Sequence, residues 1–287
     1  MTNESIQREK SMSYTDYQSL SIRRERGVAF VTISHPPMNL IDVALVKELS
    51  NFLDEAQSDD AVRVIVFESG DPEYFLAHYD VQDLLARPAQ PAKTGTITSA
   101  FQQLVERYRT SPKVTIGCIE GRARGGGSEF LLSLDMRFAS KERAILGQLE
   151  VGIGLIPGGG ATQRLPGLLG RGRALEVILS AQDYTAEQAA SYGWVNQALP
   201  SADLRPFVER LAFRIATFSP EALRSAKQAI DAAGLPLYDG LREEAYLFAQ
   251  ARTSPDGVRR MKRFLTGGGQ TRSGELNVDW VVGELAE

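Results

Sequence analysis

Apolar residues in the first half of the chain form short runs that alternate with helical patterns. Val28–Ser34, Val62–Glu68 and Lys113–Glu120 are rich in β-branched residues, and each predicts a strand. Val43–Gln57 and Ile97–Arg109 carry apolar residues at helical spacing. Short strands separated by helices predict crossover connections and a largely parallel sheet buried on both faces. The expected fold class is therefore α/β.

The pattern changes after about Leu199, where helical spacing dominates. Four helices are predicted there: Ala202–Thr217, Pro220–Ala233, Leu237–Arg252 and Pro255–Leu265. The glycine run Gly267–Gly269 is expected to begin a tail rather than to form a phosphate loop. We divide the chain into a polar, disordered N-terminal tail over residues 1–16, an α/β core over 17–200, and a C-terminal helical region and tail over 201–287.

Composition narrows the possible partners and compartment. The 287 residues include 43% hydrophobic and 24% charged residues, which is ordinary for a soluble globular protein. A formal net charge of −4 gives no basic field for nucleic acid or an anionic membrane. The single cysteine, Cys118, excludes an internal disulfide framework and a multi-cysteine zinc site. No apolar run approaches the roughly 18 residues of a membrane span, and we expect a cytoplasmic protein without a metal.

Two glycine-rich segments are candidates for binding a ligand. Gly152–Pro157 resembles a dinucleotide fingerprint, but proline stands where the third glycine is needed, so this interpretation is rejected. Gly125–Gly127 follows a predicted strand and precedes an apolar helical segment. Such a start leaves unpaired peptide N–H groups at the positive end of a helix dipole. A tight packing turn is the structural alternative.

Two carboxylates adjoin apolar, glycine-rich sequence. Glu129 lies inside the helix that Gly125–Gly127 begins, and Glu150 precedes a second glycine-rich segment. A carboxylate among apolar residues is costly unless it is hydrogen-bonded, paired or functional. Each alone is compatible with a capping role, whereas together they could hold one water. The only histidines are His35, for which a surface or packing role is favoured, and His78.

These segments resemble the blocks of the crotonase, or enoyl-CoA hydratase/isomerase, family in the same order over roughly Leu20 to Phe264. Single blocks would be weak support, but their ordered succession is specific. The matching blocks are Ile33–Leu40 (ISHPPMNL), Val62–Leu84 (VRVIVFESGDPEYFLAHYDVQDL), Gly121–Glu129 (GRARGGGSE), Gly147–Leu165 (GQLEVGIGLIPGGGATQRL), Thr185–Pro200 (TAEQAASYGWVNQALP) and Ser219–Ile230 (SPEALRSAKQAI).

The resemblance implies a spiral of ββα turns with a C-terminal helical region that assists trimer assembly, and trimers that pair into hexamers. It implies an acyl-CoA thioester as substrate, with coenzyme A as part of that substrate and no separate cofactor. The family stabilises a thioester enolate with two backbone N–H groups, which match Tyr79 and Gly126 here. In the family's hydratases two glutamates act on water, and both matching positions hold glutamate, Glu129 and Glu150.

The chain departs from the family pattern at the first donor segment. His78 replaces a common glycine and Tyr79 a common alanine; a pocket wall or packed histidine is favoured over a local acid at position 78. The Tyr79 ring is expected to narrow or reshape the acyl pocket, while its amide can still donate. Lys262 and Arg263 are the possible substitutes for the family's basic pair near the C-terminal helix. The substrate-pocket candidates are Ala77, His78, Asp80, Gly125, Pro157 and Gly158.

The paired glutamates and the family resemblance together predict an enoyl-CoA hydratase, which adds water to a 2-enoyl-CoA through an oxyanion-stabilised enolate. An enoyl-CoA isomerase needs only one carboxylate, and other enolate-forming acyl-CoA lyases or hydrolases use the same donors. A rival of another class is a non-catalytic acyl-CoA-binding subunit, which the bulky His78-Tyr79 pair would favour.

Overall fold

The structure, a computed structural model, describes residues 14, 16–88, 99–218, 220–231, 238, 245, 248–249, 252–278 and 281. The predicted N-terminal tail lies outside these residues except for Tyr14 and Asp16. The predicted helix Leu237–Arg252 also lies largely outside them. No helix in the described ranges combines the length and the apolar character needed to cross a membrane.

A six-stranded sheet has the strand order β1-β2-β3-β5-β7-β10. β1 and β2 pair antiparallel, and the other neighbouring pairs in this sheet are parallel. The three strands predicted from β-branched runs are confirmed as β2, β3 and β5. The strands of the sheet are β1 Leu20–Glu25, β2 Val28–Ile33, β3 Val64–Ser69, β5 Val114–Ile119, β7 Met136–Ser140 and β10 Gln197–Leu199.

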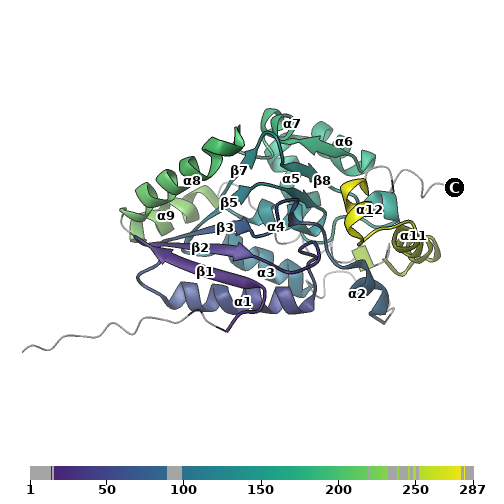
Figure 1. The fold of residues 1–287 in the computed structure, drawn as a ribbon, viewed down its shortest axis with the longest axis horizontal. Helices are drawn as coiled ribbons and strands as arrows, with labels where there is room; N and C mark the ends of the chain where they lie inside the picture. Colours follow the sequence, from purple (N-terminus) through teal and green to yellow (C-terminus); the bar gives the residue numbers. More distant parts are fainter. Residues whose placement is uncertain are drawn as a thin grey trace, which may run out of the picture.

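Helices cover both faces of this sheet, as the apolar strand sequences require. Side chains alternate along a strand, so neighbouring residues of β3 face opposite ways. Ile65 and Phe67 pack in the same cluster as the buried side of α1 (Val43–Ser58). Val64 and Val66 pack in a second cluster with α8 (Ser201–Ala216), which approaches β3, β5 and β7. α8 therefore closes the second face of the sheet (Figure 1).

A four-stranded sheet has the order β4-β6-β8-β9 and is parallel except for the β8–β9 pair. The chain passes from β3 to β4, from β5 to β6 and from β7 to β8, so these three strands of the large sheet are each followed by a strand of the small sheet. Helices follow these strand pairs, which gives the expected spiral of ββα turns. The strands are β4 Tyr74–Leu76, β6 Arg122–Arg124, β8 Ile145–Gly147 and β9 Asp183–Thr185.

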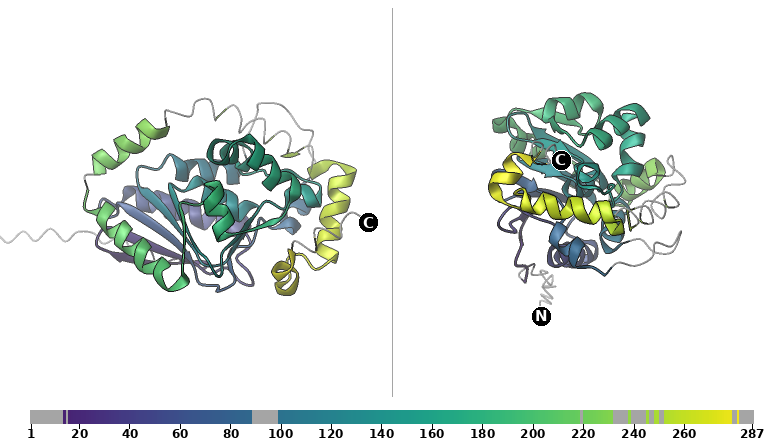
Figure 2. Two further views of the ribbon diagram at one scale, coloured as in Figure 1. Left: turned by 90° about the horizontal axis from the view of Figure 1, so that it is seen from above. Right: turned by 90° about the vertical axis from the view of Figure 1, so that its right-hand side faces the viewer.

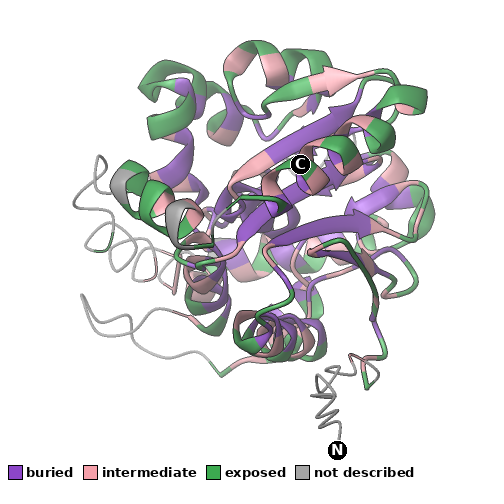
Figure 3. Ribbon diagram, turned by 90° about the vertical axis from the view of Figure 1, so that its left-hand side faces the viewer, coloured by how far each residue is buried: buried purple, intermediate pink, exposed green. Residues whose placement is uncertain are grey.

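The helices surround the strands, with exposed outer sides and buried inner sides (Figure 3). The helical predictions are confirmed for α1, α3, α8, α9 and α11 over their described residues. The remaining elements outside the strands are α2 Val81–Ala86, α3 Ala100–Arg109, α4 Gly126–Ser133, η1 Glu150–Ile153, α5 Ala161–Leu169, α6 Arg171–Ser180, α7 Ala186–Tyr192, α9 Pro220–Asp231, α11 Pro255–Thr266 and α12 Arg272–Leu276.

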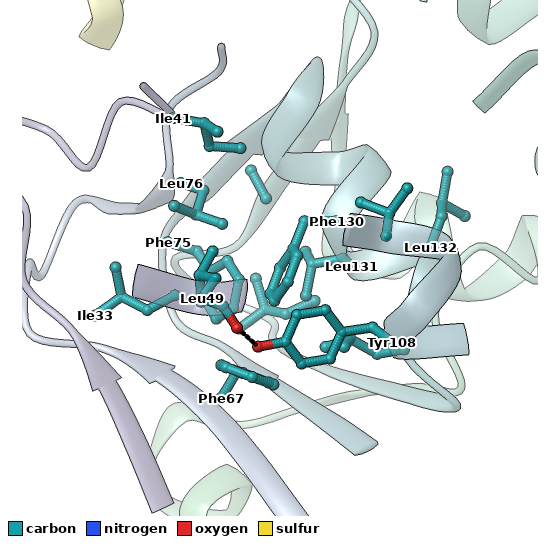
Figure 4. Packing of buried hydrophobic residues seen from close by; sticks show 14 of the residues in the cluster. Ile33, Ile41, Leu49, Phe67, Phe75, Leu76, Tyr108, Phe130, Leu131 and Leu132 are labelled. Carbon is teal, nitrogen blue, oxygen red and sulfur yellow. Dashed lines mark hydrogen bonds between the residues drawn. The ribbon is translucent and has the colours of Figure 1, made fainter. Parts of the chain in front are cut away.

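Aromatic packing fixes α4, the helix that begins at the glycine turn. The Phe67 ring of β3 makes edge contacts with the rings of Tyr108 on α3 and Phe130 on α4, at centroid distances of 5.4 and 5.1 Å. The Tyr108 hydroxyl donates to the carbonyl of Leu49 on α1 at 2.7 Å (Figure 4). Tyr108 therefore satisfies its only polar group while its ring is buried. These contacts fix α4 between the large sheet and its helices.

The predicted tail after Gly267–Gly269 is wrong. The glycines form a turn, and the chain re-enters the protein as α12, in which Gly274 and Glu275 are buried. Thr271 caps this helix by accepting from the N–H of Gly274. In Figures 1 and 2, α11 and α12 lie at one end of the molecule, whereas α8 and α9 lie at the other. The C-terminal region thus reaches both ends of the core.

Candidate active site

The first donor segment, residues 77–80, lies beside residues 39–41. The N–H of Ile41 donates to the carbonyl of His78 at 2.8 Å, and the N–H of Asp80 donates to the carbonyl of Ile41 at 2.8 Å. Buried Asn39 anchors the 39–41 segment to the neighbouring chain. Its side-chain amide donates to Ser69 Oγ and to the carbonyls of Tyr74 and Phe75. The Tyr79 peptide is therefore held between two backbone hydrogen bonds.

The second donor segment is the turn into α4. Gly125 has φ +46° and ψ −124°, a backbone conformation that a side chain would strain. A Cβ on Gly126 would lie only 3.2 Å from the peptide nitrogen of Tyr79 and 3.2 Å from its Cβ. Glycine at position 126 thus lets the two donor segments approach each other closely. The predicted helix start at Gly125–Gly127 is confirmed, although β6 precedes it.

The peptide N–H groups of Tyr79 and Gly126 donate no hydrogen bond to another described residue. For Gly126 the reason is its place in the first turn of α4, where no intrahelical acceptor exists. The neighbouring amides are already occupied, since Gly125 donates to Gly147 and Asp80 to Ile41. Two adjacent amides are therefore without an acceptor in the part of the chain that the structure describes.

Glu129 lies one turn into α4 and is almost fully buried. Its Oε1 accepts from the N–H of Gly159 at 2.7 Å and from the N–H of Ala161 at 3.1 Å, so it caps the start of α5. Burial raises the pKa of the Glu129 carboxyl, and these N–H groups with the charge of Arg164 only partly offset that effect. A raised pKa suits a carboxyl group that exchanges protons near neutral pH.

Glu150, the second predicted catalytic glutamate, lies next to the glycine turn that begins α4. It begins the 3₁₀ turn η1, which is separated from the end of β8 by Gln148 and Leu149, and it is buried. A Cβ on Gly125 would lie 2.7 Å from Glu150 Oε1 and 3.4 Å from the Cβ of His78. The glycine turn therefore makes room for this carboxylate as well as for the helix start.

One cavity of about 60 Å³ is lined by both glutamates and both donor residues. This volume is enough for more than one water, because a single water needs roughly 10–15 Å³ of such space. The Tyr79 ring forms part of the wall, with an edge contact to Phe101 at 5.6 Å and the Arg87 guanidinium bonded to its hydroxyl. The lining residues are His78, Tyr79, Val81, Leu84, Arg87, Ser99, Phe101, Gly126, Glu129, Leu149, Glu150, Ile153, Leu155, Gly158 and Phe248.

His78 forms a buried ion pair with Glu275 of α12, with Nε2 and Oε1 2.7 Å apart. Burial disfavours the imidazolium, but the charge of Glu275 and its hydrogen bond outweigh this and raise the pKa of His78. Burial also opposes the Glu275 carboxylate, but the charge of His78 overcomes it and lowers the pKa of Glu275. His78 is thus an ion-paired wall residue, and its ring is not available as an acid for a ligand.

Not every sequence candidate lines the cavity. His78 and Gly158 do, whereas Ala77, Asp80, Gly125 and Pro157 lie outside the lining set. Asp80 instead caps α2 by accepting from the N–H of Gln82. Lys262 and Arg263 lie on α11 and do not line the cavity either.

Sequence reasoning missed two residues that support the site. Asn39 was present in the ISHPPMNL block, where its amide could have been assigned to the turn that precedes it. Glu275 had no signal in the sequence, because it lies in a segment that was predicted to be a tail. Its pairing with His78 exists only in the folded chain.

Comparisons with known proteins agree with this fold. The profile of the family described as "Enoyl-CoA hydratase/isomerase" matches residues 23–265. The chain is 32% identical to the 2,3-dehydroadipyl-CoA hydratase of Escherichia coli over 86% of this chain and 95% of that protein. It is 31% identical to the short-chain-enoyl-CoA hydratase of Clostridium acetobutylicum over 75% and 82% of the two chains.

A crystal structure from Streptomyces avermitilis, assigned to the enoyl-CoA hydratases, superposes with a TM-score of 0.85 at 39% identity, covering 94% of this chain and 99% of that one. The chain belongs to the enoyl-CoA hydratase/isomerase, or crotonase, family. The expected crotonase fold is confirmed. Membership implies an acyl-CoA substrate.

Proposed function

We propose that the protein is an enoyl-CoA hydratase that converts a 2-enoyl-CoA into a 3-hydroxyacyl-CoA. The observation that carries this proposal is the shared cavity of Glu129, Glu150, Tyr79 and Gly126. Both glutamates are buried there, and the amides of Tyr79 and Gly126 have no acceptor among the described residues. The hydratases of E. coli and C. acetobutylicum named above support the same reaction class.

The two amides would act on the thioester oxygen. Attack of water at C3 moves electrons through C2 into the thioester carbonyl, where negative charge develops. The N–H groups of Tyr79 and Gly126 would donate hydrogen bonds to that oxygen and stabilise the enolate, with no reorganisation of the backbone. Loss of one such donor in other enzymes costs about 2.7–4 kcal/mol of barrier.

The two glutamates would divide the proton transfers. Water must lose a proton as its oxygen bonds to C3, and C2 must gain a proton as the enolate collapses. Two carboxyl groups on one cavity supply a base for the first transfer and an acid for the second, which typically accelerates a reaction by about 10²–10⁴-fold. An apolar wall that includes Leu84, Leu149 and Phe101 would surround the acyl chain.

The test is turnover of purified protein with crotonyl-CoA and with longer and branched 2-enoyl-CoAs. Hydration predicts loss of the enoyl-thioester absorbance and a product heavier by one water. Conversion of a 3-enoyl-CoA without that mass change would identify an isomerase instead. Binding of these thioesters without turnover, unaffected by Glu129→Gln with Glu150→Gln, would identify a non-catalytic acyl-CoA-binding subunit. We also expect a homotrimer or a hexamer, which light scattering measures.

A further inference from the structure

Glu275 is an acidic group in the interior of the protein, far in sequence from its charged partner, His78. It has no exposed surface and lies 197 positions from His78. A buried carboxylate is costly unless it is paired and hydrogen-bonded. Oε1 meets both conditions, because it faces His78 Nε2 and also accepts from the N–H of Gln270 at 2.7 Å.

The ion pair continues into the first donor segment. Nδ1 of His78 lies 2.8 Å from the carbonyl oxygen of Tyr79. A carbonyl and a carboxylate can only accept, so Nδ1 donates to Tyr79 and Nε2 donates to Glu275, and the ring is an imidazolium. The side chain of His78 therefore donates a hydrogen bond to the carbonyl of Tyr79, the residue whose N–H is the proposed oxyanion donor. On its other side, the carbonyl of His78 accepts from Ile41.

The second donor segment is held by the same residue. The backbone carbonyl of Glu275 accepts from a guanidinium N–H of Arg124 at 2.8 Å. Arg124 is buried, lies two positions before Gly126, and forms a two-pronged ion pair with Asp183 at 2.7 and 2.6 Å. One residue of α12 thus contacts the segment of each proposed donor.

We propose that Glu275 is a positioning residue: its carboxylate, through His78, sets the place and orientation of the Tyr79 amide, and its backbone carbonyl, through Arg124, holds the segment that leads to Gly126. This proposal rests on the proposed oxyanion role of Tyr79 and Gly126, but it does not depend on hydration as the final reaction. It also assigns a purpose to the bulky His78, which a pocket wall alone would not require. Other charged groups near the pair are Arg124 and Glu150, which are both present in every variant below.

The test uses Glu275→Gln, which keeps the size of the side chain and one acceptor oxygen but removes the charge that holds the imidazolium. We expect kcat to fall about 10–100-fold, as for other small misplacements of a reacting geometry, with KM changed by less than about threefold. The matched control is Asp135→Asn, which removes the carboxylate from another ion pair, with Lys227 at 2.8 Å, outside the cavity lining. The control should lose stability and keep kcat.

A spectroscopic measurement separates this proposal from the hydratase assignment. Acetoacetyl-CoA forms an enolate that absorbs in the near ultraviolet, so the band of the bound ligand reports how well the two amides stabilise a thioester enolate. Glu275→Gln should weaken this band at saturating ligand with unchanged total binding. A wild type that enolises acetoacetyl-CoA but never hydrates an enoyl-CoA would overturn only the proposed function.

The double variant His78→Gln with Glu275→Gln removes both charges of this pair, so neither is left without its partner, and it guards against misfolding of the single variant. It should recover the unfolding temperature toward the wild type but keep the weakened enolate band. An unchanged band and kcat in either folded variant, or an equal loss in Asp135→Asn, would overturn the positioning role. The proposal would also fall if the band weakened only in proportion to unfolded protein.

Discussion

Replacement of Glu129 by glutamine separates its two roles, because the carboxylate both lines the cavity and caps α5. In Glu129→Gln the amide oxygen takes the place of Oε1 and still accepts from Gly159 and Ala161. The NH₂ group then takes the place of Oε2 and can no longer receive a proton from water. We expect kcat to fall by about 10²–10⁴-fold, which corresponds to about 2.7–5.4 kcal/mol of barrier.

The thermal stability of Glu129→Gln should not fall with its activity. The pKa of Glu129 is raised in the fold, so ionisation of this carboxyl opposes folding above its ordinary pKa. A neutral glutamine removes that cost, and the unfolding temperature at neutral pH should be equal or higher. Glu129→Ala instead leaves two buried N–H groups without their acceptor, at about 1–3 kcal/mol each.

The assay is crotonyl-CoA hydration together with thermal unfolding, and the control is Glu68→Gln on β3. Glu68 pairs with Arg205 and accepts from Thr32, and it does not line the cavity, so its kcat should stay at the wild-type value. Wild-type turnover in Glu129→Gln, combined with destabilised Glu129→Ala, would refute the reasoning and leave Glu129 as a helix cap only.

Three further predictions follow from the packing and charges of the site. Gly127→Ala should lose about 1–3 kcal/mol or more of unfolding free energy in urea titrations, because its Cβ would lie 2.2 Å from the carbonyl oxygen of Leu76. The control Gly167→Ala on α5 should not lose stability in this way, because its Cβ would meet open space. Tyr79→Ala keeps the N–H donor and removes the ring at Phe101, so kcat/KM for longer 2-enoyl-CoAs should rise relative to crotonyl-CoA; an equal loss on all chain lengths would contradict a wall role. The stability advantage of the wild type over the double variant at positions 78 and 275 should be greatest near about pH 5–6. This advantage is lost at higher pH, because His78 (raised pKa) deprotonates, and at lower pH, because Glu275 (lowered pKa) is protonated. A pH-independent difference in unfolding free energy would argue against the ion pair.

The long elements could be predicted from sequence because their signal is local. A run such as VRVIVFE reports burial on both faces, and the spacing of α1 reports one apolar side, so β3 and α1 lie close to their predicted bounds. The three-residue strands β4, β6 and β8 were not predicted individually, because so few residues carry no periodic signal. β1 was missed since most of its residues are exposed at the sheet edge.

The sequence by itself determined which chemical groups are available: two glutamates in apolar, glycine-rich surroundings, and a glycine turn that begins a helix. Only the tertiary structure decided that these groups share one cavity, that Glu129 also caps α5, and that Asp80 caps α2 instead of lining the pocket. The pairing of His78 with Glu275 was equally a tertiary result. A buried charge needs a partner of opposite charge, and the partner of His78 lies 197 positions away in sequence but 2.7 Å away in space.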